Sequence, residues 1–164
     1  MRRILEALVV IALPAALAGC GDSGSASNAG KAADTRGVIV SASDCSTFGP
    51  GAVERCARAI ERAVDVHERT AATYTSLEDC EKAVGEQACE RAQSGHYRIR
   101  LSAFMVTLGE TARAEPLYPV SGKDAGFQTA RKDTLLASDR SLAFSRLATS
   151  VAQMHATSDA PRRR

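Results

Sequence analysis

The main fold signal lies in residues 44–89, which read DCSTFGPGAVERCARAIERAVDVHERTAATYTSLEDCEKAVGEQAC. Gly49-Pro50-Gly51 is a turn cluster, and after it apolar residues recur at spacings of three and four. This spacing places them on one face of a helix. We therefore predict a helix over 52–72 with charged residues on its outer face. The apolar positions are Val53, Cys56, Ile60, Val64, His67 and Ala71.

A second, shorter helix is predicted over 77–84. Thr75 and Glu78 have the spacing of a capping box, in which each side chain bonds to the backbone N–H of the other residue. Gly85 follows at a position where helices commonly end on glycine. Because the connection between the two helices is short, we expect them to form an antiparallel helical hairpin.

The cysteines Cys45, Cys56, Cys80 and Cys89 flank these helices. Cys20 is the fifth cysteine and belongs to the N-terminal segment, which has the layout of an export signal (next paragraph). An even number of remaining cysteines in an exported chain is typical of disulfides. In an antiparallel hairpin, Cys56 and Cys80 would lie about 16 Å apart along the axis, whereas a disulfide requires Cα atoms within about 7 Å. A Cys45–Cys80 bridge would stretch the short segment before Cys56 to the limit of its reach, so the local pairs Cys45–Cys56 and Cys80–Cys89 are favoured. The connectivity stays open, because the antiparallel arrangement is itself an expectation.

The first residues have the layout of a secretory signal peptide at 1–19. A basic start, Met1-Arg2-Arg3, precedes an apolar run that is too short to span a bilayer. Leu17-Ala18-Gly19-Cys20 resembles a bacterial lipobox. This resemblance implies cleavage before Cys20 and its acylation, which would attach the chain to a membrane on the periplasmic side. In similar lipoproteins, an Asp directly after the lipidated Cys retains the protein in the inner membrane. Here Gly21 follows Cys20 and Asp22 comes one place later, so the outer membrane is favoured.

The chain after the signal peptide divides into four parts. Residues 20–37 are rich in Gly, Ser and Ala, and predict a flexible tether behind the lipidated cysteine. A cysteine-stapled helical hairpin domain is placed at 38–92 and a less regular extension at 93–138. A candidate helix and a basic tail are placed at 139–164.

The extension carries weaker structural signals. Apolar residues over 101–108 recur at helical spacing and predict a short amphipathic helix. Segments 117–120 and 127–130 predict a weak β-hairpin. Pro116 and Pro119 favour an edge position for its first strand, because proline cannot donate a ladder hydrogen bond. The helical spacing involves Leu101, Phe104, Met105 and Leu108.

A terminal helix is predicted over 139–154, with Ser138 or Asp139 as its cap. Together with the helical hairpin, these elements predict a small, mainly α fold stapled by disulfides, with a less regular C-terminal region. The apolar face of the terminal helix is expected to consist of Phe144, Leu147, Val151 and Met154.

Composition and motifs exclude several classes of function. With 21 basic and 19 acidic residues, the formal net charge is +2, too small to indicate a nucleic-acid partner. The sequence has no close pair of zinc ligands, no Cys-x-x-Cys motif, no Walker loop and no dinucleotide glycine pattern. We therefore predict no catalytic residues, no metal ligands, no cofactor and no enzyme activity. His67 on the apolar stripe is interpreted as a structural histidine.

Two hypotheses of function follow. The first is a non-catalytic lipoprotein of the cell envelope, held at the membrane by lipid on Cys20, that presents a surface to another envelope protein. The second is a thiol-redox or metal-handling lipoprotein in which one cysteine pair cycles or binds metal. The second predicts at least two free or easily reduced thiols. The missing catalytic motifs favour the first hypothesis.

A motif pattern runs through the cysteine block and continues weakly beyond it. Its residues are Asp44-Cys45, Cys56 at a helix start, Thr70-Ala71, Tyr74, Glu78-Asp79-Cys80, Gly85, Cys89, Phe104-Met105 and Pro116-Leu117-Tyr118. The pattern resembles that of the YgiB-like proteobacterial lipoproteins, a family of unknown function. The resemblance implies an envelope lipoprotein without an assigned activity.

Overall fold

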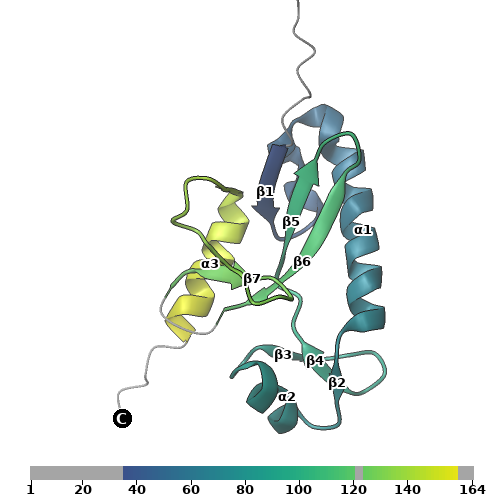
Figure 1. The fold of residues 1–164 in the computed structure, drawn as a ribbon, viewed down its shortest axis with the longest axis vertical. Coiled ribbons are helices and arrows are strands. Elements are labelled where there is room, and N and C mark those ends of the chain that lie inside the picture. The colour runs from purple at the N-terminus through teal and green to yellow at the C-terminus, as the bar shows by residue number, and fades with distance from the viewer. Residues whose placement is uncertain (1–34, 121–123, 159–164) are drawn as a thin grey trace, which may run out of the picture. The chain divides into compact units, whose positions relative to one another are not determined.

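The computed structural model describes residues 35–120 and 124–158 (Figure 1). The predicted signal peptide, Cys20 and most of the predicted tether lie outside these residues. The described part contains a six-stranded sheet in the order β8-β7-β6-β5-β1-β9, and a separate three-stranded sheet in the order β2-β4-β3. The prediction of a mainly α fold is therefore wrong, because the described chain is a mixed α/β structure.

The six-stranded sheet is antiparallel except where β1 and β9 run parallel. Its strands come from both ends of the described chain, so the sheet depends on contacts between residues far apart in sequence. The strands are β1 (Thr35–Ile39), β5 (Ala103–Leu108), β6 (Arg113–Pro119), β7 (Gly126–Gln128), β8 (Thr134–Leu136) and β9 (Ala143–Phe144).

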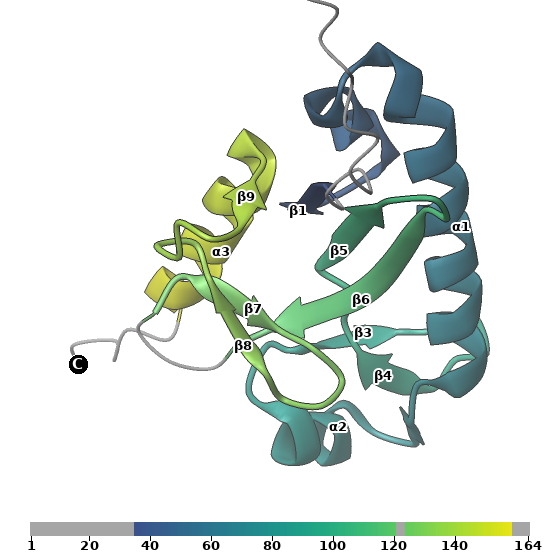
Figure 2. The ribbon, with the colours of Figure 1, turned by 45° about the horizontal axis from the view of Figure 1, so that its top comes forward.

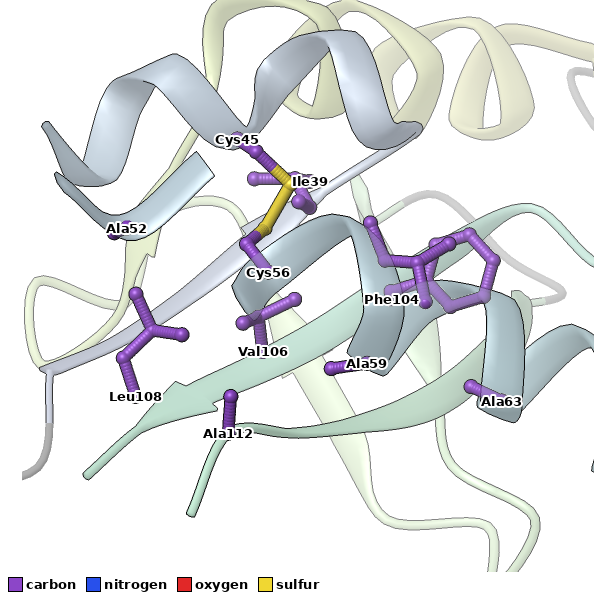
Figure 3. Close-up of a cluster of buried hydrophobic side chains, with 11 residues drawn as sticks. Ile39, Cys45, Ala52, Cys56, Ala59, Ala63, Phe104, Val106, Leu108 and Ala112 are labelled. Carbon is purple, nitrogen blue, oxygen red and sulfur yellow. A yellow bond between two sulfur atoms is a disulfide. The ribbon is translucent and has the colours of Figure 1, made fainter. Parts of the chain in front are cut away.

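Helix α1 (Val53–Thr70) packs on β5 and β6, and two 3₁₀ helices lead into it, η1 (Ala42–Phe48) and η2 (Pro50–Ala52). The helix predicted over 52–72 is thus confirmed. Figure 3 shows its small residues facing the apolar side chains of β5. The main core cluster consists of Ile39, Cys45, Ala52, Cys56, Ala59, Ile60, Ala63, Phe104, Val106, Leu108 and Ala112.

Residues 103–108 form strand β5, so the short amphipathic helix expected at this place is wrong. Phe104, Val106 and Leu108 are buried and face α1, which is the period of two that a strand requires. The apolar residues Phe104 and Leu108 also fit a helical period, and this ambiguity produced the error. The strand partners on either side, β1 and β6, decide between the two conformations.

Helix α2 (Leu77–Val84) has the predicted bounds and ends at Gly85, whose φ is +112°. Its N-cap is Ser76 rather than Thr75, since the Asp79 N–H donates to the Ser76 Oγ at 3.1 Å. Helix α2 packs on β2 (Thr73–Tyr74), β3 (Cys89–Arg91) and β4 (Tyr97–Ile99) (Figure 1). The expected helical hairpin is therefore wrong: each helix covers a different sheet instead of packing against the other.

The predicted β-hairpin between 117–120 and 127–130 is confirmed, with Tyr118 opposite Gln128 and Pro119 opposite Phe127. The expected edge position is wrong, because β6 lies between β5 and β7. The prolines are tolerated because β6 pairs with β5 over Arg113–Leu117 and with β7 at its last two residues. Each proline is thus paired on one side of the strand.

The terminal helix exists as α3 (Arg146–Ser158), with Phe144 in β9 and Ser145 as the cap instead of Ser138 or Asp139. The Ala148 N–H donates to the Ser145 Oγ at 3.0 Å. The predicted apolar face is wrong in part: Leu147 is 44% exposed and Met154 is 57% exposed, whereas Ala148 and Ala152 are fully buried. The alanines let the helix approach the sheet closely, on the side away from α1 (Figures 1 and 2).

A second core cluster lies beneath α3. It lies between α3 and the face of the large sheet that α1 does not cover. The apolar interior therefore has two layers, one on each face of this sheet. None of the helices in the described ranges is long and apolar enough to cross a bilayer. The cluster consists of Val38, Ala103, Leu117, Phe127, Ala148 and Ala152.

Candidate functional site: the disulfides and the buried polar contacts

The four cysteines of the described chain form two disulfides, Cys45–Cys56 and Cys80–Cys89. Their Cα atoms are 5.8 and 6.2 Å apart, within the usual range for a disulfide. These are the local pairs that spacing favoured, although the antiparallel hairpin used to favour them does not exist. The pairs form because each bridge joins elements that are neighbours along the chain.

Each disulfide fastens a helix to the segment beside it. Cys45–Cys56 joins η1 to the first turn of α1 and is part of the main core (Figure 3). Cys80–Cys89 joins α2 to β3. All four residues are at most 4% exposed, so the sulfur atoms are shielded from solvent reagents and metal ions. Cys20, the predicted lipidation site, lies outside the described residues.

His67 and Tyr118 form a buried polar contact between α1 and β6. The Nδ1 atom of His67 lies 3.1 Å from the Tyr118 hydroxyl, and His67 is only 1% exposed. Its Nε2 atom has no hydrogen-bond partner among the described residues. Burial lowers the pKa of His67, and the positive charge of Arg98 adds to this effect. The His67 ring is therefore held neutral, as a structural histidine requires.

Tyr118 is held in its neutral form by the same surroundings. Burial raises the pKa of its phenol, and the negative charge of Glu115 raises it further. The contact therefore joins two neutral rings, which also lie 5.5 Å apart between their centroids. Such a pair stabilises the packing of α1 on β6, and it offers neither a nucleophile nor an accessible base.

Arg98 links the end of α1 to the three-stranded sheet. Its Nε donates to the Glu90 carboxylate at 3.0 Å, and its guanidinium lies 3.6 Å from the Glu68 carboxylate. The Arg98 side chain is only 14% exposed, so this network is shielded more than a surface ion pair. It fixes β4 beside β3 and α1 at once.

Asp44 and Ser145 connect the two ends of the described chain. The Ser145 hydroxyl donates to the Asp44 carboxylate at 2.8 Å, and the Val40 N–H donates to the same oxygen at 3.1 Å. Ser145 also caps α3, so one hydroxyl couples the segment after β1 to that helix. Sequence reasoning missed these contacts, although Asp44 and Tyr118 both belong to the motif pattern of the resemblance.

The described residues thus define a disulfide-stabilised α/β domain whose buried polar groups hold its elements together. Within these ranges, no group of three His, Cys, Asp or Glu side chains is arranged to hold a metal ion. A family profile described as "protein of unknown function (DUF1190)" matches residues 33–162. The chain belongs to this family, which agrees with the YgiB-like resemblance.

Curated relatives are similar over a shorter region. UPF0441 proteins of two Klebsiella pneumoniae strains, subsp. pneumoniae ATCC 700721 / MGH 78578 and strain 342, are each 39% identical over 67 residues. The match covers 40% of this chain and 30% of each relative. The matched region therefore spans less than a third of the length of each of these curated relatives. No solved structure matches.

Proposed function

We propose that this chain is a lipid-anchored protein of the bacterial cell envelope that acts as a non-catalytic structural or interaction module. Its lipid is carried by Cys20, and its folded part faces the periplasm, with the outer membrane favoured. The observation that carries the proposal is the pair of buried disulfides. Disulfides of this kind persist in oxidising compartments such as the periplasm, and that is where the lipobox-like Leu17-Ala18-Gly19-Cys20 would deliver the chain.

The interaction part of the proposal rests on how the polar groups are used. The buried pair His67–Tyr118 and the network around Arg98 connect secondary-structure elements to one another. Large apolar side chains on two helices face solvent instead: Val66 on α1 is 46% exposed and Leu147 on α3 is 44% exposed. We take these two exposed positions as the first candidate contact points for a protein partner.

The anchor is tested by the intact mass of the chain extracted from membranes with detergent. We expect residues 1–19 to be missing and acyl chains to be present on the new first residue. A Cys20→Ser variant should lose both the acyl mass and the membrane fractionation, whereas a neighbouring Asn28→Ala variant should keep them. An unacylated chain in the soluble periplasmic fraction would refute the proposed anchor.

The same mass experiment separates the interaction module from the thiol-redox or metal-handling alternative. Alkylation without reduction should add nothing, and alkylation after reduction and unfolding should add four groups, one for each of the four cysteines in the two disulfides. Two or more thiols that are open before reduction would favour the alternative. The burial of all four cysteines gives the alternative no support.

The interaction is tested by photocrosslinking in living cells. A photoreactive amino acid placed at Val66 or Leu147 should capture an envelope protein, and the same amino acid at the charged, exposed position Arg69 serves as the control. If neither apolar position yields a crosslinked envelope protein, and deletion of the chain leaves the envelope unchanged, the proposed interaction module is wrong.

A further inference from the structure

A groove of about 430 Å³ lies on the face of the large sheet that α1 does not cover. The register places Arg36, Thr107 and Arg113 in one row across β1, β5 and β6. Met105 and Glu115 are partners in the next row of the same face. Side chains of directly paired residues point to the same side of a sheet, so these five residues line one groove.

The groove is the part of this face that α3 leaves open. In the row of Met105, Val38 on β1 is fully buried in the core beneath α3. Arg36 and Arg113 lie in the next row, further from the core beneath α3, and both are exposed. The groove therefore has an apolar boundary on one side and solvent on the other, and its floor is the backbone of three hydrogen-bonded strands.

The charges in the groove are unpaired within the described chain. Neither Arg36 nor Arg113 forms an ion pair there, and the Glu115 carboxylate forms none. Arg36 is nevertheless held over the groove, because its Nη2 donates to the Met105 Sδ at 3.1 Å. The two guanidiniums flank Thr107 across one row, while the carboxylate lies on the neighbouring row.

Two guanidiniums on either side of Thr107 favour an oxyanion between them, because each presents a planar fork of N–H donors to carboxylate or phosphate oxygens. Glu115 would repel a ligand that carried negative charge alone. A ligand with an oxyanion and a cationic amine satisfies both halves of the groove. Successive rows of one face are about 6.6 Å apart along a strand, a separation that a few covalent bonds and the flexible side chains can span.

We propose that this groove binds a small zwitterion whose carboxylate or phosphate contacts Arg36 and Arg113 and whose primary ammonium group contacts Glu115. The chemistry is shared by a phosphoethanolamine lipid headgroup and by a dipeptide, whose two ends supply the ammonium and the carboxylate. The inference rests on the sheet register and on the groove, and it does not depend on the acylation of Cys20.

The test is a calorimetric titration of the full chain, purified in nonionic detergent with its disulfides closed. O-phosphoethanolamine and glycylglycine are the two zwitterionic probes, and inorganic phosphate and phosphocholine are the controls. We expect at least one zwitterion to bind about tenfold more tightly than both controls, because phosphate lacks the amine and phosphocholine lacks its N–H donors. Equal binding of all four probes, or no binding, would overturn the proposal.

Variants assign the two halves of the site. Arg113→Gln should weaken binding of the zwitterion about tenfold or more, and Glu115→Gln should abolish its preference over inorganic phosphate. Arg69→Gln removes an exposed arginine from α1 and should change neither result. An unchanged affinity in Arg113→Gln, with an unchanged unfolding midpoint, would refute the role of the arginine pair.

The source of the zwitterion follows from which probe binds more tightly. If O-phosphoethanolamine is preferred, water-soluble glycerophosphoethanolamine should compete with it, whereas glycerophosphocholine should not. If glycylglycine is preferred, neither glycerophosphodiester should compete, and the natural ligand is peptide-like. Both results support the shared chemistry. Competition by both glycerophosphodiesters would contradict it, because glycerophosphocholine offers no N–H donor to Glu115.

Discussion

Removal of the Cys45–Cys56 disulfide should destabilise the folded chain more than removal of Cys80–Cys89, although the loops they close are similar. The sequence separations are 11 and 9 residues. Loop-closure entropy assigns about 2.8 kcal/mol to the first and about 2.6 kcal/mol to the second. Chain entropy therefore hardly distinguishes the two bridges, and any larger difference reports on packing.

The packing around the two bridges differs. Cys45 and Cys56 belong to the main core between α1 and the sheet, whereas Cys80 and Cys89 belong to neither core cluster. Replacing both cysteines of a pair by alanine removes two buried sulfur atoms, worth about 2 kcal/mol where the surroundings cannot close in. We expect a loss of about 5 kcal/mol for C45A/C56A and about 3 kcal/mol for C80A/C89A, whose short helix can shift on its small sheet.

Urea denaturation of the oxidised chain, followed by far-ultraviolet circular dichroism, measures both losses. Wild-type chain in excess reductant is the control, because it loses the cross-links and keeps the sulfur atoms. A typical domain has a free energy of unfolding of only about 5–15 kcal/mol, so C45A/C56A is expected to be marginal at 37 °C. Equal losses in the two double variants, or a loss below about 1 kcal/mol in C45A/C56A, would refute the reasoning.

Three further predictions concern the sheet and its contacts. Gly126→Ala should cost about 3 kcal/mol, because a Cβ there would clash with the Leu135 carbonyl oxygen. Gly51→Ala, with nothing within 4 Å of its Cβ, should be nearly neutral in the same urea assay. Burial lowers the pKa of His67 below 6.5 in the folded chain. As the pH falls, the unfolded chain is therefore protonated at this histidine before the folded chain is, so the free energy of unfolding should fall as the pH drops below about 6.5. His67→Gln should flatten that slope between about pH 7.5 and 5.5, and an unchanged slope would contradict the assignment. Ser145→Ala should cost about 2 kcal/mol and speed hydrogen exchange in the first turn of α3, since it removes the cap and the part-buried hydrogen bond to Asp44. Unchanged exchange would count against this coupling.

Helices α1 and α2 could be predicted because their signals are local. The apolar stripe from Cys56 to His67 and the glycine at position 85 act within one or two turns. The same holds for the local disulfides, which close short loops however the helices pack. The antiparallel hairpin failed because periodicity shows that a helix has an apolar face, and does not show which element covers it.

The sheet could not be predicted because its pairing is non-local. Val38 pairs with Met105, 67 positions later, and with Phe144, later still. No window of neighbouring residues contains this information, and β9 is only two residues long. The Asp44–Ser145 hydrogen bond escaped for the same reason, since it spans 101 residues. The groove at Arg36 and Arg113 exists only once β1, β5 and β6 are in register.

The place of β1 in the sheet bears on the proposed anchor. The strand begins at Thr35, only 15 positions after Cys20 in the sequence, and it is paired on both sides, with β5 over five residues and with β9 over two. A strand with two neighbours resists being pulled out of a sheet better than an edge strand, because both ladders must break together. Asp44, close behind β1, adds the bond to Ser145. If lipid on Cys20 holds the chain to a membrane, tension would therefore act on a central strand. Phe144→Gly should weaken β9. In a chain pulled from residue 20, it should then lower the unfolding force by a larger fraction than it lowers the free energy of unfolding in urea. Equal fractional losses would show that β9 carries no special part of this load.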